Sequence, residues 1–134
     1  MQENEQKIML NKGLRDEEKI RIDNVLKILR TLVFVPQPLS NIQKGDIENQ
    51  LKDFGLNIET LVQHSNEELI DLLVRCHLDF DHLEQFADFL LELSKTEEYN
   101  FQEKALALYQ YIQLKSNVFS FGINSKIASA KAKK

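Results

Sequence analysis

The chain has 134 residues, a formal net charge of −4 and a hydrophobic content of 43%. This length suits one domain with its own hydrophobic core, and the acidic balance disfavours a nucleic-acid-binding surface. A single cysteine cannot form a disulfide within the chain, so we expect a reducing cytoplasm. No apolar run approaches the roughly 20 residues of a membrane-spanning helix, and no signal-peptide core follows the polar start, so no membrane partner is expected.

Residues 1–14 contain a few apolar residues interrupted by polar ones, and we expect a weakly ordered N-terminal arm. Residues 15–122 predict a single helical domain. Its first helix starts near Asp16, and its apolar stripe recurs at the three- and four-residue steps of an amphipathic helix: Ile22, Val25, Leu26, Leu29, Leu32 and Val33. Pro36 and Pro38 end this helix and predict a stiff extended connector, because proline disfavours helical geometry in the residue before it.

Shorter helical segments are expected between residues 40 and 77. The first ends at Gly55, which with the apolar residue after it is typical of a helix C-terminus. Residues 58–62 predict one or two helical turns. Ser65 and Glu68 then form a capping box, in which each side chain accepts a hydrogen bond from the other residue's backbone amide. This box predicts the start of the next helix.

Two amphipathic patterns lie back to back between Asp79 and Asn117. Asp79 is suited to cap the first, because its carboxylate can accept from the free amides of the first turn, and Asn100 with Glu103 resembles a capping box for the second. The polar link at residues 95–99 is long enough only for a turn, and short connections make consecutive helices antiparallel neighbours. We therefore predict an all-α fold, a compact bundle of five to six helices that ends in an antiparallel helical hairpin.

Residues 123–134 predict a short helix followed by a basic tail. This segment contains four lysines and no acidic residue: Lys126, Lys131, Lys133 and Lys134. We interpret the lysines as a solubilising end of the chain. Weak, salt-dependent nucleic-acid binding through them is the alternative.

Three segments carry a resemblance to a known family. The stretches Gly55–Leu61 and Ser65–Leu73 resemble an uncharacterised family of small helical bacterial proteins whose C-terminal halves end in a tetratricopeptide-like hairpin, and Lys104–Tyr109 falls in that place. The resemblance extends over roughly residues 20–115. It implies an all-helical fold and no known activity.

The hairpin also resembles the general tetratricopeptide pattern. Ala105 and Tyr109 match the small and aromatic positions of its second helix, whereas Ile112 stands where a small residue is usual. One such unit is visible in the chain. Solenoids need about three stacked repeats to bury their faces, so a single chain does not predict a peptide-binding superhelix.

Cys76, His77 and His82 form the densest cluster of metal-ligand residue types in the sequence. A structural zinc site uses four such ligands, and adjacent residues such as Cys76 and His77 diverge by about 100° on a helix. We favour a helix junction with a packed cysteine and surface histidines, and expect no cofactor. A metal-dependent factor or small enzyme centred on this cluster is the alternative, although apolar surroundings would raise the pKa of the thiol and make it a poor nucleophile.

Aromatic residues near the C-terminus predict a partner-binding surface. Tyr109 and Tyr111 are about 200° apart on one helix, so both cannot face one core, and Phe119 and Phe121 follow closely. The alternative is that the last segment folds back and covers these rings. The sequence thus favours a non-catalytic cytoplasmic helical interaction or scaffold module, which binds a protein partner or forms a homodimer.

Overall fold

The computed structural model describes residues 2–33, 41–95, 100–116 and 121–132, and within these ranges the side chains of all residues except 2–15, 41, 121 and 132. The described elements are all helical, so the predicted all-α class is confirmed. In chain order they are α1 (Gln2–Val33), α2 (Asn41–Leu51), the 3₁₀ turn η1 (Lys52–Phe54), α3 (Ile58–Gln63), α4 (Asn66–Arg75), α5 (Phe80–Ser94), α6 (Gln102–Ser116) and α7 (Phe121–Ala132).

The predicted number of five to six helices is too low for this structure. Seven α-helices occupy the described ranges, because the short α3 and the C-terminal α7 are both formed as separate elements. In none of these ranges is a helix long and apolar enough to cross a membrane.

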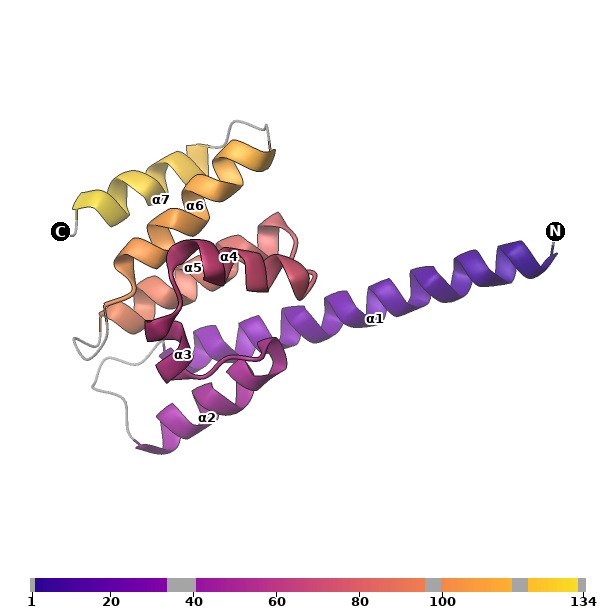
Figure 1. Cartoon of the computed structure of the whole chain (residues 1–134), viewed down its shortest axis with the longest axis horizontal. Helices are drawn as coiled ribbons and strands as arrows, with labels where there is room; N and C mark the ends of the chain where they lie inside the picture. Colours follow the sequence, from indigo (N-terminus) through magenta and orange to yellow (C-terminus); the bar gives the residue numbers. More distant parts are fainter. Residues whose placement is uncertain (1, 34–40, 96–99, 117–120, 133–134) are drawn as a thin grey trace.

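The helices lie side by side in the order α2, α1, α5, α6 and α7, with α4 against α6 (Figure 1). The predicted antiparallel hairpin is formed by α5 and α6. The side-chain amide of Gln102 donates to the carbonyl of Ala130 at 2.9 Å, and Gln113 bonds Asn124 at the other end of the pair. Because the start of α6 meets the end of α7, these two helices are also antiparallel.

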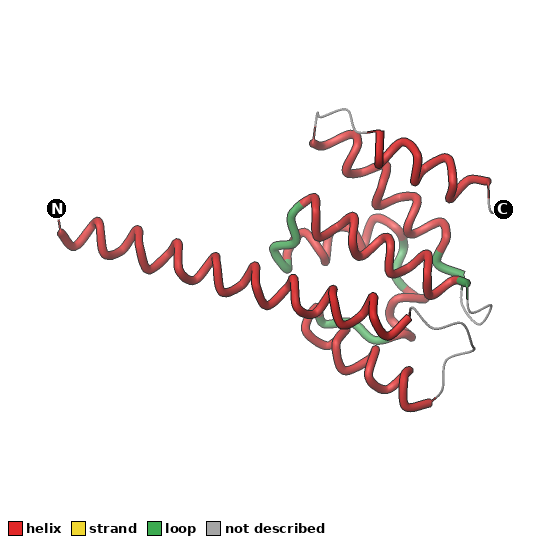
Figure 2. Tube along the Cα trace, turned by 180° about the vertical axis from the view of Figure 1, so that it is seen from behind, coloured by secondary structure: helices red, strands yellow, loops and turns green. Residues whose placement is uncertain are grey.

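The first helix is longer than the pattern predicts. It begins at Gln2 rather than near Asp16, and its N-terminal part projects from the bundle (Figure 2). The predicted apolar stripe is buried between Ile22 and Val33, with Leu32 half-buried. Weak order in residues 1–14 stays a prediction, and the predicted proline connector lies outside the described residues.

Two helix ends share one hydrogen-bond arrangement, the Schellman motif. At the first, Gly55 has φ 71° and its amide donates to Lys52, while the next amide reaches back to Leu51. The predicted C-terminal stop at Gly55 is thus confirmed. His77 occupies the same position after α4, also with φ 71°. This is the left-handed region, which favours glycine over residues with a Cβ atom.

Three helices begin with reciprocal capping boxes. The predicted box of Ser65 and Glu68 is confirmed, with hydrogen bonds of 2.8 and 3.1 Å, and the bonds to Ser65 lower the pKa of the Glu68 carboxyl. Asn57 and Thr60 form a further box, which was not predicted, before α3. Asp79 caps α5 as predicted, and the third residue of that box is His82. The start of α5 is therefore fixed by a histidine ring as well as a carboxylate.

The centre of the core lies beneath α5. The rings of Phe54, Phe86 and Phe89 meet edge to face in two pairs, with centroids 6.0 and 5.6 Å apart. All three side chains are buried, and each pair contributes about 0.5–1.5 kcal/mol beyond the burial of its area. The pair of Phe54 and Phe86 joins η1 to α5, which also packs against α1 and α6, so the polar edge of α5 has a defined position.

Candidate functional site

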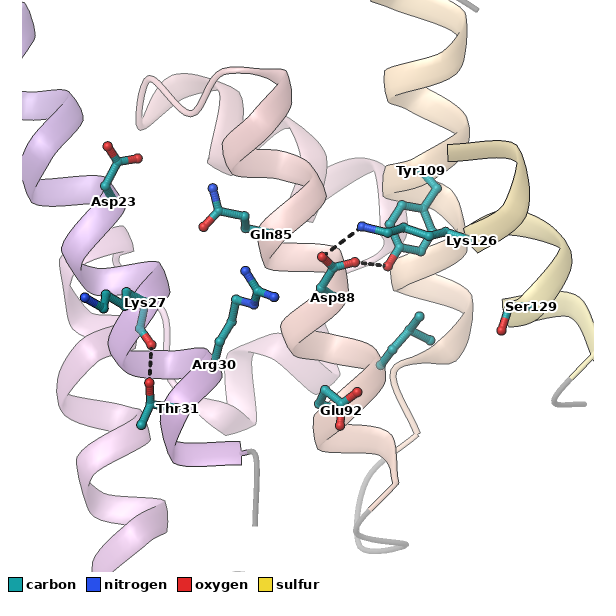
Figure 3. Close-up of a pocket in the computed structure, with 11 residues that line it drawn as sticks. Asp23, Lys27, Arg30, Thr31, Gln85, Asp88, Glu92, Tyr109, Lys126 and Ser129 are labelled. Carbon is teal, nitrogen blue, oxygen red and sulfur yellow. Dashed lines mark hydrogen bonds and ion pairs between the residues drawn. The ribbon is translucent and has the colours of Figure 1, made fainter. Parts of the chain in front are cut away.

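A groove of about 1010 Å³ crosses α5, with α1 on one side and α7 on the other (Figure 3). The wall from α1 is formed by side chains at helical steps of three and four residues: Asp23, Lys27, Arg30 and Thr31. Residues at such steps share one face of a helix. The groove is thus bordered by the polar edge of the same helix that contributes its apolar stripe to the core.

The floor of the groove comes from α5, which contributes Gln85, Asp88, Leu91 and Glu92. These residues also follow helical steps, and they lie on the flank of the face that is buried in the core. Leu91 is half-buried and packs against the core, so it provides an apolar patch between polar neighbours. The groove combines charged, amide and apolar side chains in one place.

Asp88 joins three helices at this site. Its Oδ1 atom accepts a hydrogen bond from the hydroxyl of Tyr109 at 2.5 Å, and its Oδ2 atom accepts from Nζ of Lys126 at 3.0 Å. Lys126 also pairs with Glu84 and lies 5.9 Å from the centroid of the Tyr109 ring (Figure 3). Hydrogen bonds between charged groups are about twice as strong as neutral ones. The position of α7 at the groove is therefore set by charged contacts as well as packing.

The environment of Asp88 raises the pKa values of both of its partners. Burial of Tyr109, together with its hydrogen bond to the carboxylate, raises the pKa of its phenol well above the ordinary range. Burial lowers the pKa of Lys126, but its hydrogen bonds to Glu84 and Asp88 outweigh this effect and raise the pKa overall. Near neutral pH the site therefore holds a neutral phenol and a charged ammonium.

The other carboxylates of the groove also have partners. Oδ1 of Asp23 lies 2.7 Å from Nε2 of His82, and Glu92 pairs with Lys95 at 2.8 Å. The ring nitrogen Nδ1 of His82 accepts from the backbone amide of Asp79 at 3.2 Å. We assign a ring hydrogen to Nε2 and none to Nδ1, because this tautomer makes both contacts hydrogen bonds. His82 thus donates to Asp23.

The three predicted metal candidates face different partners. Cys76 contacts the carbonyl of Phe54 at 3.7 Å, His77 lies 3.8 Å from Glu18 and is exposed, and His82 is buried. Among the described residues, no three side chains of metal-ligand type are arranged so that they could hold a metal ion. The predicted surface position of His82 is wrong, because α1 covers the start of α5 and Asp23 supplies the partner that a buried imidazole needs.

Cys76 behaves as its apolar surroundings predict. The side chain is half-buried against the core, and this burial raises the pKa of its thiol. A thiol with a raised pKa forms little of the thiolate that acts as a nucleophile. The predicted direction of this pKa is confirmed, because the effect of burial outweighs the positive charge of Arg21, which lowers the pKa.

The predicted aromatic surface is divided by the structure. Tyr109 is fully buried and its hydroxyl reaches the groove, whereas Tyr111 is half-buried at the edge of the core. Phe119 and the side chain of Phe121 lie outside the described residues. The packing of α7 on α6 matches the alternative that the last segment folds back, at least over the Tyr109 ring.

Sequence reasoning missed the residues that define the groove. Asp88 was not singled out, and Lys126 was assigned to a solubilising tail, although Lys126 is half-buried and pairs with Glu84 and Asp88. Arg30 was not singled out. The available signal is that Arg30 and Asp88 each lie at the margin of the apolar stripe of their own helix, directly beside a buried residue.

The comparisons with known proteins give no further assignment. No protein-family model matches the chain, and no curated protein or solved structure matches it either.

Proposed function

We propose that this protein is a non-catalytic helical interaction module of the cytoplasm, and that it binds a segment of a protein partner in the groove across α5. The observation that supports this proposal is the groove itself, in which helices far apart in the sequence line one hollow of about 1010 Å³. Its carboxylates are held by hydrogen bonds and ion pairs, and the pKa of the Tyr109 phenol is raised, while the Cys76 thiol outside the groove also has a raised pKa. Such groups suit recognition better than proton transfer or nucleophilic attack near neutral pH.

We further infer that α5 and α6 form a tetratricopeptide-like hairpin, with α7 in the position of the first helix of a following repeat. The antiparallel order of the three helices supports this inference. So does the burial of Ala105 and Tyr109, which occupy the small and aromatic positions of the second helix. In such an arrangement α5 and α7 face the same side, and this is the side on which the groove lies.

A site-specific cross-linking experiment tests the binding of a partner. A photoreactive amino acid replaces Gln85 on the groove floor, and in a matched control it replaces Arg75, an exposed residue of α4 that does not line the groove. Irradiation in the cells that make the protein should give a discrete adduct from the Gln85 position only. Mass spectrometry of the adduct then identifies the partner and the segment bound.

The identity of the adduct distinguishes a different protein partner from a second copy of the chain. An adduct of the chain with itself would identify the partner as a second copy, which sedimentation should then show as a dimer. Adducts of equal yield from both positions, or none from Gln85, would contradict partner binding in this groove.

A further inference from the structure

The carboxylates that line the groove have partners, whereas the cations on its α1 wall have none within the described part of the chain. Each of its carboxylates has a partner: Asp23 contacts His82, Asp88 contacts Tyr109 and Lys126, and Glu92 contacts Lys95. The cations of α1 differ from them. Among the side chains that the structure describes, Lys27 and Arg30 have no hydrogen-bond or ion-pair partner. The groove therefore has an excess of unused positive charge on its α1 wall.

Arg30 is the better placed of these two cations. Figure 3 shows its guanidinium extending from α1 into the space above α5, toward Gln85 and Asp88, while the amine of Lys27 points away from that space. A guanidinium has five N–H donors in a planar fork, which fits two oxygen atoms of one carboxylate at once. The side-chain amide of Gln85 also has no hydrogen-bond partner among the described residues, so it adds a neutral donor beside the fork.

We propose that the groove recognises an acidic peptide segment, one carboxylate of which binds the Arg30 guanidinium while a neighbouring apolar side chain packs on Leu91. This inference rests on the proposed function, since it names the chemistry of the segment that the same groove binds. The carboxylates on the floor do not oppose such a ligand strongly, because their charges are already balanced by Lys126 and Lys95. A paired carboxylate repels a second one less than an unpaired one does.

A polyanion such as nucleic acid is a poorer fit to the same charges. Its phosphates follow one another every few ångströms, so several would lie against Asp23, Asp88 and Glu92 at once. Among the described side chains that line the groove, Arg30 is the one cation without a partner that points into it. A single carboxylate flanked by uncharged atoms makes use of Arg30 without meeting the acidic floor at several points.

Nuclear magnetic resonance titration tests this inference with a defined probe. The probe is a blocked hexapeptide with one glutamate next to a leucine among otherwise uncharged residues, and the matched control peptide has glutamine in place of that glutamate. The full chain is titrated at moderate salt up to about 5 mM peptide, the range of weak contacts. We expect the glutamate peptide to shift the side-chain Nε–H signal of Arg30 and the signals around Gln85, and to bind about tenfold more tightly than the glutamine peptide.

Substitutions distinguish a specific contact with Arg30 from an effect of the protein's net charge. Arg30→Gln should weaken binding of the glutamate peptide about tenfold, and Arg30→Lys should weaken it less, because a lysine keeps the charge but loses the fork. Arg75→Gln is the matched control, since Arg75 pairs with Asp71 and lies outside the groove. It should leave binding unchanged. Arg30 is exposed and lacks a described partner, so its substitution should also leave the melting temperature unchanged.

Several results would overturn the inference. These are equal binding of the two peptides, equal binding by Arg30→Gln and the unsubstituted chain, signal shifts that map outside the groove, or tighter binding of inorganic phosphate than of the glutamate peptide. Failure of the probe to bind, together with a specific cross-link from the Gln85 position, would reject an acidic ligand but keep the groove as a partner site. If the photoreactive residue at position 85 gives no adduct, the groove is not a partner-binding site, and the proposed function is rejected as well.

Discussion

Nε2 of His82 lies 2.7 Å from Oδ1 of Asp23, and this contact joins the first turn of α5 to the middle of α1. The same ring accepts the backbone amide of Asp79 through Nδ1, so both of its nitrogen atoms have partners. His82 is 2% exposed. Through its two ring nitrogens the buried His82 thus joins the N-cap of α5 to α1. The position of α1, and with it the α1 wall of the groove, depends on this contact.

His82→Ala should lower the free energy of unfolding by about 2–4 kcal/mol, because it leaves a cavity and removes both hydrogen bonds. Urea denaturation followed by circular dichroism measures the change. Asp23→Asn is the control, since an amide oxygen can still accept from Nε2, and it should cost less than about 1 kcal/mol. Equal losses in the two variants would show that the Asp23 carboxylate, not the packing of the ring, stabilises this junction.

Tyr109→Phe tests the contact between α6 and Asp88. The substitution removes the hydroxyl that donates at 2.5 Å but keeps the ring in the core. We expect a loss of about 1–2 kcal/mol at neutral pH, at the lower end for a charged acceptor because Asp88 keeps its bond to Lys126. Thermal unfolding measures this loss. An unchanged stability would mean that a water molecule replaces the phenol hydroxyl at Asp88 with no loss of free energy of unfolding.

Alkaline pH should destabilise the chain through the same residues. The folded pKa values of Tyr109 and Lys126 are both raised above their unfolded values, which are about 10. Stability linked to a raised pKa is complete below the unfolded value and is lost as pH rises through the folded value. The free energy of unfolding should therefore fall above about pH 10. Urea titrations between neutral pH and pH 11 should show a smaller fall in Tyr109→Phe than in the unsubstituted chain.

Substitution by alanine should change the stability of the chain in opposite directions at Gly45 and Gly55. Gly45 lies inside α2, and a Cβ atom there would meet nothing within 4 Å, so Gly45→Ala should stabilise the chain by about 0.5–1 kcal/mol. Gly55 also has open space, but its φ of 71° strains any residue with a Cβ. Gly55→Ala should destabilise by about 1 kcal/mol. Denaturant midpoints of the two variants provide the comparison, and changes of the same sign would contradict this account.

The ends of the helices follow from the sequence because the interactions that fix them are local. Ser65 and Glu68 are three residues apart, and Gly55 acts on the residues directly before it, so each signal is complete within a few residues. The groove, in contrast, is formed by contacts between residues that are far apart in the sequence. Asp88 meets Tyr109 across 21 residues and Lys126 across 38, and no local pattern specifies which helices pack together.

The two tyrosines of α6 show the same limit. Their angular separation on a helix predicts that they face different surroundings, but it does not identify which one is buried. That choice depends on where α5 and α7 pack, and it places Tyr109 inside and Tyr111 at the edge. His82 was assigned to the surface for the same reason, since its burial requires a partner on α1, 59 residues away.

The length of α1 provides a practical means of attachment. Gln2 and Arg30 belong to one continuous helix, and at about 1.5 Å per residue the two are separated by about 42 Å along its axis. Ala132, by contrast, follows Ser129 of the groove wall by three residues. A surface tether or fluorescent label joined before Gln2 is therefore held clear of any ligand at Arg30, whereas the same group joined after Ala132 would lie beside the groove wall and obstruct the measurement.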